Sequence, residues 1–233
     1  MTQERLKELI KEMDSLKNPE KIKIFQRFFK TGKGEYGEGD IFLGLNVPTE
    51  KELAKKYKDL DFSDIETLLD SKIHEHRMLG TMILCNHSKT QPEKAFKFYL
   101  KNAKRMNNWD LVDCSAPQIV GKFLINKDKS ILLKLSESTN LWEKRISIIS
   151  TLSLIRDNQL QPTLDISKKL LGDKHDLIHK AVGWMLRELG KKDEKLLEKF
   201  LHDNYHELPR TSLRYAIERF SPEKREYYLY KIR

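Results

Sequence analysis

The sequence has few of the residues that disulfide-bonded and turn-rich folds require. Its 233 residues include only two cysteines, Cys85 and Cys114, and this count excludes both a disulfide framework and a four-cysteine zinc site. Ten glycines and seven prolines are too few for an all-β fold with many tight turns. Both cysteines lie in apolar helical stretches, so we expect two buried free thiols.

Long apolar runs are also missing. No stretch reaches the roughly 18 consecutive apolar residues that a membrane span needs. The opening residues, MTQERLKELIKEMDSL, alternate charged with apolar side chains and lack the apolar core of a signal peptide. We therefore expect a cytoplasmic protein with no membrane partner.

The common motifs of enzymes that use nucleotides, metals or nucleophiles do not appear in a fitting context. Gly32, Gly34 and Gly37 match G-x-G-x-x-G, but the pattern follows a helical FQRFFK and precedes an extended DIFLG, the reverse of a dinucleotide site. Two histidine pairs at helical spacing, residues 175 and 179 and residues 202 and 206, lack a third ligand and lie among charged residues. We expect no metal and no cofactor.

What is abundant is charge and helical periodicity. Charged residues make up 34% of the chain, and 44 Lys and Arg against 35 Asp and Glu give a formal charge of +9. Such an excess favours partners with phosphate backbones or anionic lipids without choosing between them.

The apolar pattern repeats as pairs of short helices separated by polar breaks, several of which place proline in a first helical turn. Pairs recurring every 30–40 residues indicate an all-α, HEAT-like solenoid that forms one domain over residues 1–233, and a compact helical bundle is the alternative. Thr49 with Glu52, and Ser63 with Glu66, are possible capping boxes. We expect helices near residues 2–16, 19–30, 49–58, 62–70, 74–87, 91–105, 109–126, 128–137, 140–157, 161–171, 175–190, 192–204, 209–219 and 222–231.

Residues 31–46, TGKGEYGEGDIFLGLN, interrupt this pattern and hold five of the ten glycines. The spacing of glycines around Tyr36 predicts a β-hairpin or extended flap with Lys33 and Tyr36 near its tip. A cation and an aromatic ring at such a tip are suited to enter a DNA groove. A mobile surface loop is the alternative interpretation.

One stretch, N-N-W-D-L-V-D at residues 107–113, is unusual for a plain core helix. Trp109 and Asp113 are four residues apart, so a helix presents the aromatic ring and the carboxylate on one face. Asp113 lies one turn inside the helix, where an acid is either solvated or held for a purpose. The residues alone leave both interpretations open.

Two later stretches also place tryptophan beside arginine. Trp142 and Arg145 are three residues apart in L-W-E-K-R, as are Trp184 and Arg187 in A-V-G-W-M-L-R-E. Trp142 fits a core position. Trp109 and Trp184 fall on the predicted inner helices of the solenoid, where they would meet across a concave face.

These three ordered motifs resemble the AlkD-like DNA alkylation repair proteins, which are bacterial DNA glycosylases built from HEAT-like repeats. The resemblance spans roughly residues 20–220. It implies a monomeric, nucleoid-associated enzyme of base excision repair that grips duplex DNA and excises cationic N3- or N7-alkylated purines without turning the base into a deep pocket.

The resemblance also implies roles for individual residues. Asp113 matches the catalytic carboxylate of that family, Trp109 and Trp184 match aromatics on the sugar of the damaged nucleotide, and Arg145 matches an arginine on the adjacent backbone. Arg187 is a further candidate for DNA contact. The glycine-rich segment resembles a hairpin of relatives associated with branched DNA, so a non-catalytic binder of branched or damaged DNA is the alternative function.

Overall fold

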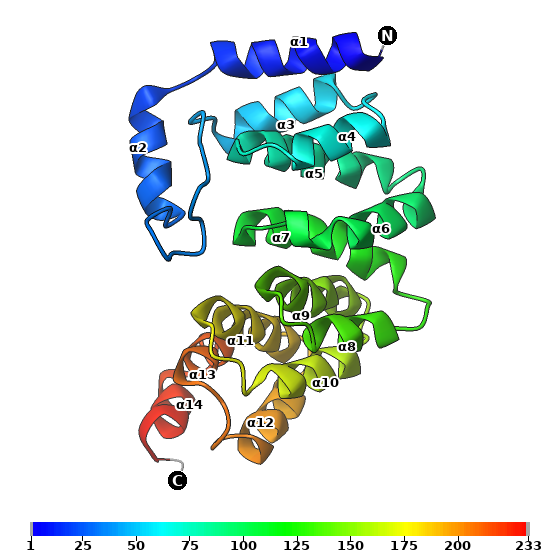
Figure 1. The fold of residues 1–233 in the computed structure, drawn as a ribbon. Coiled ribbons are helices and arrows are strands. Elements are labelled where there is room, and N and C mark those ends of the chain that lie inside the picture. The colour runs from blue at the N-terminus through cyan, green and yellow to red at the C-terminus, as the bar shows by residue number, and fades with distance from the viewer. Residues whose placement is uncertain (1, 232–233) are drawn as a thin grey trace. The chain divides into compact units, whose positions relative to one another are not determined.

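The computed structural model describes residues 2–231, which form fourteen α-helices and no β-strand (Figure 1). The prediction of an all-α protein is confirmed, and each predicted helix has a counterpart. The chain divides into two compact units, Met1–Ser115 and Ala116–Arg233. The single domain over residues 1–233 stays a prediction.

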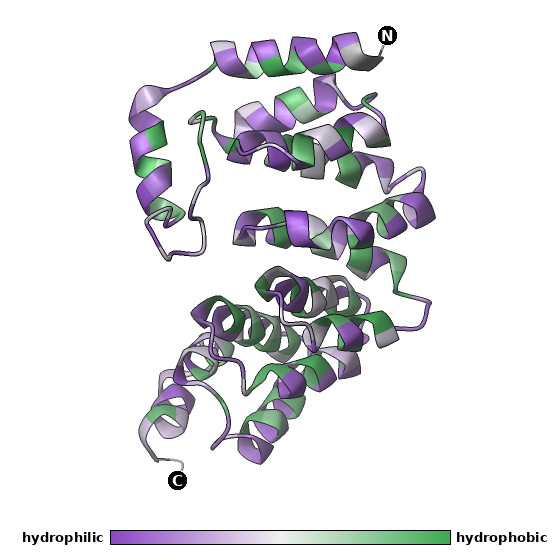
Figure 2. Cartoon of the chain, in the orientation of Figure 1, coloured by the Kyte–Doolittle hydropathy of each residue, from purple (hydrophilic) through white to green (hydrophobic). Residues whose placement is uncertain are grey.

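The first unit contains seven helices, α4 and α3 packing against α5, and α1 packing against α4. In Figure 2, α1 turns its hydrophobic residues toward its neighbours, and its Leu6, Leu9 and Met13 are buried. The helices are α1 (Thr2–Ser15), α2 (Pro19–Phe28), α3 (Val47–Lys56), α4 (Phe62–Leu69), α5 (His74–His87), α6 (Pro92–Lys101) and α7 (Trp109–Ala116), with a short 3₁₀ turn at Ala103–Arg105.

The second unit is arranged around α9 and α11, which pack against each other and against the helices on either side. Its helices are α8 (Ser130–Ser136), α9 (Leu141–Arg156), α10 (Gln161–Leu170), α11 (Asp176–Gly190), α12 (Glu194–Asp203), α13 (Arg210–Ala216) and α14 (Pro222–Glu226), with π-helical turns at Pro117–Gly121 and Tyr227–Lys231.

Helix α9 is buried over nearly its whole length although it contains several hydroxyl side chains. The Ser147, Ser150 and Thr151 hydroxyls donate to main-chain carbonyls three or four residues earlier, at 2.7, 2.6 and 2.7 Å. These bonds satisfy the polar groups inside the helix itself, so small side chains let neighbouring helices approach closely. Trp142 is buried here, as the sequence predicts.

Two helices of the first unit have N-caps three and two residues earlier than the predicted capping boxes. Asn46 caps α3 by accepting from the backbone N–H of Thr49 at 3.0 Å, and Asp61 caps α4 in a capping box with Asp64. The capping boxes predicted at Thr49 and Ser63 are therefore wrong. Asn and Asp cap as well as Ser and Thr, so composition alone did not separate the candidates.

The predicted helix over residues 109–126 is not regular. Helix α7 ends at Ala116 and a π-helical turn follows from Pro117, which lacks the backbone N–H that would continue the ladder. The Pro117 carbonyl accepts instead from the Ser153 hydroxyl of α9 at 2.7 Å.

The hairpin predicted at residues 31–46 is wrong. Residues 31–40 form successive turns, and residue Ile41 makes a single parallel bridge with Ile73. The following residues lie on α5, where the Glu75 carboxylate accepts from the backbone N–H groups of Leu43, Gly44 and Leu45 at 2.9, 2.7 and 3.3 Å. Because this buried carboxylate takes the N–H groups that a partner strand would need, the segment is extended but unpaired.

Close packing of α11 against α13 requires a glycine at position 183. A Cβ at Gly183 would lie 2.5 Å from the Ser212 carbonyl oxygen and 2.5 Å from the Tyr215 Cβ. We expect Gly183→Ala to lower the free energy of unfolding by about 1–3 kcal/mol, because the helices must separate. Urea unfolding followed by circular dichroism measures the loss.

The matched control is Gly172→Ala, whose added Cβ would meet nothing within 4 Å. It should change the free energy of unfolding by less than about 0.5 kcal/mol. Equal unfolding midpoints for the two variants would contradict the close approach of α11 and α13.

Candidate active site

The start of α7 places two candidate residues on one face of the first unit. Trp109 is the first residue of the helix, and Asp113 follows one turn later. The Asn108 side chain, fully buried, accepts from the backbone N–H of Trp109 at 2.8 Å and holds the helix start in place. As predicted from their spacing, Trp109 and Asp113 line the same pocket.

Aromatic rings from α2 and the extended segment continue from the Trp109 indole. Trp109 stacks on Phe29 with ring centroids 5.4 Å apart, and Phe29 stacks on Phe42 at 5.2 Å. Phe42 in turn stacks on the His74 imidazole at 4.8 Å. Phe28 meets the Trp109 ring edge-on at 5.8 Å and is 59% exposed, an unusual fraction for a phenylalanine.

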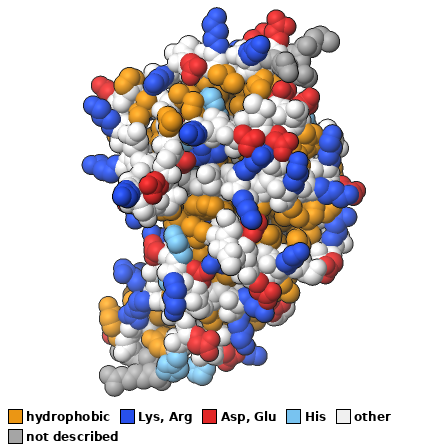
Figure 3. All heavy atoms as spheres, viewed as in Figure 1, with side chains coloured by type: hydrophobic (Ala, Val, Ile, Leu, Met, Phe, Trp, Pro, Cys, Tyr) orange, Lys and Arg blue, Asp and Glu red, His pale blue; other side chains and the backbone are white. Residues whose placement is uncertain are grey.

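These rings line a pocket of about 730 Å³ in the first unit. In Figure 3, hydrophobic side chains gather between α2 and α3, whereas Lys and Arg are spread over the visible face. Acidic side chains outnumber basic ones in the lining. The pocket is lined by Phe25, Phe28, Phe29, Phe42, Leu45, Asn46, Val47, Pro48, Glu50, Lys51, His74, Glu75, Met78, Met82, Trp109, Asp110, Asp113 and Cys114.

A buried ion-pair network lies behind the pocket, and His74 is at its centre. His74 Nε2 donates to the Asp110 carboxylate at 2.8 Å, and His74 Nδ1 donates to Asp40 at 3.4 Å. Arg77 donates to Asp40 at 2.6 Å, and the Asn108 amide lies 3.4 Å from the same carboxylate. The network joins the glycine-rich segment, α5 and the start of α7.

The network decides the charge of His74. Burial opposes protonation, but the charge of Asp110 and the hydrogen bonds to Asp110 and Asp40 outweigh it and raise the pKa of His74 to about 9. Burial also opposes ionisation of Asp40, yet His74 and Arg77 lower its pKa below the ordinary value. His74 is therefore an imidazolium at neutral pH, stacked on the Phe42 ring and tilted against the Phe29 ring.

Glu50 on α3 behaves in the opposite way. Its side chain is buried, and desolvation, followed by the charges of Glu75 and Asp110, raises its pKa to about 8 although His74 opposes the shift. At neutral pH it is mainly a neutral carboxylic acid. It lines the same pocket as Asp113.

The prediction of two buried thiols is wrong for Cys114, which is exposed, while Cys85 is half-buried. Cys114 lies in the pocket lining on α7, and its thiol donates to the Leu111 carbonyl at 3.5 Å. Desolvation raises the pKa of this thiol. Because a thiolate is the reactive form, Cys114 is chemically quiet at neutral pH.

The glycine-rich segment reaches the site through only one of its two predicted residues. Tyr36 is half-buried, and its hydroxyl oxygen accepts from the Trp109 indole N–H at 3.2 Å. Lys33 is exposed. Tyr36 therefore fixes the edge of the Trp109 ring, a role that the sequence did not indicate.

The other predicted site residues belong to the second unit. Arg145 on α9 is buried and donates to the Leu177 carbonyl, and Trp184 on α11 is half-buried. Arg187 on α11 pairs with Glu218, which follows α13. The convergence of these residues with Trp109 and Asp113 stays a prediction.

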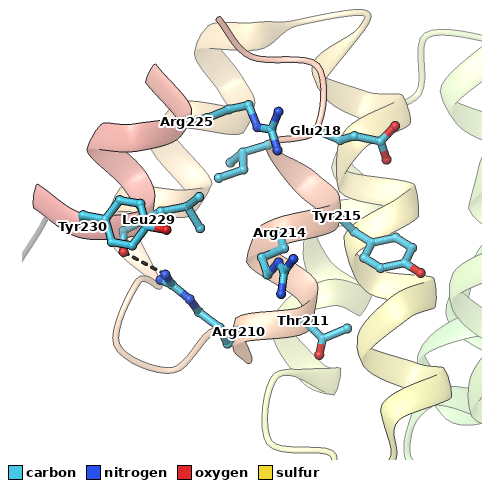
Figure 4. Close-up of a pocket in the computed structure, with 9 residues that line it drawn as sticks. Arg210, Thr211, Arg214, Tyr215, Glu218, Arg225, Leu229 and Tyr230 are labelled. Carbon is cyan, nitrogen blue, oxygen red and sulfur yellow. Dashed lines mark hydrogen bonds between the residues drawn. The ribbon is translucent and has the colours of Figure 1, made fainter. Parts of the chain in front are cut away.

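A second pocket, of about 710 Å³, lies between α13 and the last helices of the second unit. Arg210 and Arg214 face it from α13, and Arg225 faces it from α14 (Figure 4). Arg210 donates to the Leu229 carbonyl at 2.8 Å and lies over the Tyr230 ring. Three arginines around one pocket form a strongly basic surface.

Sequence reasoning missed most of the pocket wall. Phe25 and Phe28 of FQRFFK lie in α2, a helix that has no buried residue, and this is a readable signal for a functional face. Phe29 directly follows the helix and is buried. Glu50 and His74 carried no signal, because their significance depends on burial and on partners distant in sequence.

Across residues 2–231, no three His, Cys, Asp or Glu side chains lie in a metal-binding group. His179 Nε2 instead lies 2.7 Å from the Asp173 carbonyl, and the His175 side chain caps α11. None of the helices in this part of the chain has the length and apolar character to cross a membrane.

The fold and site define a class: an all-α protein of paired helices with a carboxylate beside an aromatic wall. The family model described as DNA alkylation repair enzyme matches residues 9–220, so the chain belongs to the DNA alkylation repair enzyme family. This confirms the resemblance seen in the sequence motifs.

A solved structure described as a predicted DNA alkylation repair enzyme from Enterococcus faecalis has a similar fold. The TM-score is 0.71 at 17% sequence identity, covering 88% of this chain and 97% of that chain. At this identity the likeness concerns the fold alone. The comparison with curated proteins gave no match.

The raised pKa of His74 predicts how stability depends on pH. The folded protein binds this proton more tightly than the unfolded chain, so its contribution is complete below pH 6.5 and is lost as pH rises through about 9. That loss is about 3 kcal/mol. We expect His74→Gln to flatten the fall in unfolding free energy between pH 6.5 and 9, as measured by urea unfolding at several pH values.

Glu50 also lowers the free energy of unfolding as pH rises, between pH 4.5 and about 8. The reason is that the unfolded chain releases this proton at a lower pH than the folded protein does. The His74 charge opposes the rise in the Glu50 pKa, so His74→Gln retains a fall from Glu50, and the flattening is expected mainly between pH 8 and 9. The control is His202→Gln, an exposed histidine with 76% of its side chain accessible. Identical pH slopes for wild type and His74→Gln would rule out a charged His74.

Proposed function

We propose that the protein is a monofunctional DNA glycosylase that excises cationic N3- or N7-alkylated purines from duplex DNA. The observation that carries this proposal is the placement of Asp113 and Trp109, one helical turn apart, in the lining of one pocket. Membership of the DNA alkylation repair enzyme family supports it.

The chemistry requires little acid assistance. An alkylated purine is already a cation, so when the bond between C1′ and N9 breaks, the bonding electrons neutralise the departing base. The sugar gains positive charge as this bond stretches. The Asp113 carboxylate stabilises that charge electrostatically and orients the water that attacks C1′. As the new bond between C1′ and oxygen forms, the water loses one proton to solvent, which leaves a neutral hydroxyl on C1′.

Aromatic faces complete the proposed transition-state environment. The Trp109 ring, fixed by Tyr36 at its edge and Phe29 on its face, offers π-density to the positive sugar. We assign Trp184 the same role and Arg145 the adjacent phosphate, as the family resemblance implies. These two assignments require the second unit to meet the DNA beside the lesion.

Binding to the DNA backbone is assigned to the basic surface of the second unit. Phosphate contacts provide affinity without sequence preference, which suits an enzyme that searches for damage. Arg210, Arg214 and Arg225 around one pocket are the candidates. Arg187 is already paired with Glu218, so it contributes less.

Non-catalytic binding of branched DNA was the alternative function. It depended on a hairpin over residues 31–46, and these residues form turns and an extended segment packed on α5. No structural observation favours that alternative, and the excision assay below separates the two functions.

The catalytic role of Asp113 predicts that Asp113→Asn lowers the rate of excision by about 10²–10³, the usual effect of removing one preorganised electrostatic group. Release of 7-methylguanine from duplex DNA under single-turnover conditions measures the rate. Asp165→Asn, an exposed acid of α10 in the second unit, is the control and should leave the rate unchanged. No base release by wild type above the Asp113→Asn background would end the proposal.

The phosphate role of Arg214 predicts a change in salt dependence. Arg214→Ala should reduce the slope of log affinity against log salt by about 1, because one fewer counterion is released on binding. Fluorescence anisotropy with an undamaged duplex at several salt concentrations measures this slope. Lys97→Ala, which removes a cation paired with Glu93, should leave the slope unchanged; equal slopes for wild type and Arg214→Ala would remove Arg214 from the interface.

A further inference from the structure

The proposed reaction depends on the start of a short helix. Helix α7 has eight residues, and Trp109 and Asp113 are its first and fifth. An isolated helix of this length is marginal in water, and its first turn frays easily because the first N–H groups have no partner within the helix. The orientation of the two side chains must therefore come from contacts with other parts of the fold.

Those contacts come from one short stretch of the glycine-rich segment, which lies beside the start of α7 (Figure 1). The Tyr36 hydroxyl accepts from the Trp109 indole N–H at 3.2 Å. The Asp40 Oδ2 atom accepts from the Asn108 amide and from His74 Nδ1, each at 3.4 Å. Asn108 in turn accepts from the Trp109 backbone N–H at 2.8 Å. Both the ring and the backbone of Trp109 are therefore held from this stretch.

Asp40 also reaches the second residue of the helix, through His74. While His74 Nδ1 faces Asp40, its Nε2 donates to the Asp110 carboxylate at 2.8 Å. Arg77 fixes the other oxygen of Asp40 at 2.6 Å. The Asp40 side chain is only 8% exposed, so water competes little for these bonds. Together, Tyr36 and Asp40 control three consecutive residues at the start of α7.

The glycine-rich segment is itself held in a fixed conformation. The Glu35 and Glu38 carboxylates accept from backbone N–H groups three and four residues earlier, at 2.9 and 2.7 Å. Gly37 lets the segment pass close to the end of α2, because a Cβ there would lie 2.4 Å from the Phe29 carbonyl oxygen. A segment fixed in this way can set the position of the residues that it contacts.

The charge of the segment does not suit a phosphate backbone. Residues 31–40 contain three acids, Glu35, Glu38 and Asp40, against one base, Lys33. An acidic stretch repels phosphate, whereas binding to a DNA backbone is gained by neutralising phosphates with cations. Orientation of α7 therefore accounts for this stretch better than DNA binding does.

We propose that Tyr36 and Asp40 are positioning residues of the proposed excision, and that the glycine-rich segment orients the start of α7. Tyr36 acts through the Trp109 ring. Asp40 acts through Asn108 and His74. The inference rests on the proposed glycosylase function and adds to it the residues that set the geometry of its site. Such residues matter because a displacement of about 1 Å in a preorganised site can lower a rate about 10²-fold.

The test uses the full chain and measures excision of 7-methylguanine from duplex DNA under single-turnover conditions. Increasing protein concentration separates the maximal rate from the half-saturating concentration. We expect Tyr36→Phe to lower the maximal rate about tenfold, because it removes one hydrogen bond from the Trp109 ring. We expect Asp40→Asn to lower it about 10²-fold, because it weakens all three side-chain contacts of the carboxylate.

The half-saturating concentration should stay within about twofold of wild type in both variants, because the residues do not bind DNA. Matched controls lose comparable interactions away from the pocket. Tyr57→Phe removes a hydroxyl that donates to Glu12 at 2.6 Å, and Asp70→Asn weakens an ion pair with Arg105. Both controls should match wild type in the maximal rate and in the half-saturating concentration.

A spectroscopic measurement tests the Tyr36 contact without relying on activity. The chain has three tryptophans, so a ¹H–¹⁵N NMR spectrum contains three indole N–H signals, and Trp109→Phe identifies its own signal by removing it. We expect Tyr36→Phe to move this signal and to leave those of Trp142 and Trp184 in place. Circular dichroism checks that each variant is folded. If Asp40→Asn does not fold, Tyr36→Phe decides the proposal, because it removes no buried charge.

The outcomes separate the positioning role from the glycosylase function. Unchanged maximal rates in the folded variants, or an unmoved Trp109 signal in Tyr36→Phe, would overturn the positioning role. A raised half-saturating concentration at an unchanged maximal rate would also overturn it, because the segment would then bind DNA. In these cases excision by wild type leaves the glycosylase function intact. No base release by wild type would reject the glycosylase and the positioning role with it.

Discussion

The site depends on one buried interaction, the imidazolium of His74 held between Asp110 and Asp40. Asp110 belongs to the helix turn that carries Trp109 and Asp113, and Asp40 belongs to the segment that carries Tyr36 and Phe42. One charged ring therefore sets the position of both walls of the pocket. Removing His74 would leave buried acids without a compensating charge. The resulting loss of unfolding free energy is much larger than the net stabilisation that the ion pair provides.

This arrangement separates two electrostatic tasks. The whole chain carries a formal charge of +9, which attracts a polyanion over a distance of about one Debye length. Inside the pocket the balance is reversed, with acids facing an aromatic wall. Acids in a pocket repel an anionic ligand, so this lining is complementary to a ligand, or to a developing charge, that is positive.

Local sequence signals predicted the helices well and the connections poorly. Helix α11, for example, has a strong apolar periodicity and a clear start and end. The segment at residues 31–46 was misjudged because its conformation depends on Glu75, about thirty residues later, which takes the backbone N–H groups of Leu43 and Gly44. The exposure of Cys114 was misjudged because an apolar helix face that borders a pocket looks like a core face.

The sequence by itself determined that the protein is all-helical and that Trp109 and Asp113 share a helix face, because helix periodicity acts over three or four residues. Its motifs also indicated the DNA alkylation repair enzyme family. Only the tertiary structure decided that Phe28 and Phe29 join Trp109, that His74 is charged, and that Glu50 is neutral. Burial and charge pairing act between residues distant along the chain, and the fold alone brings these residues together.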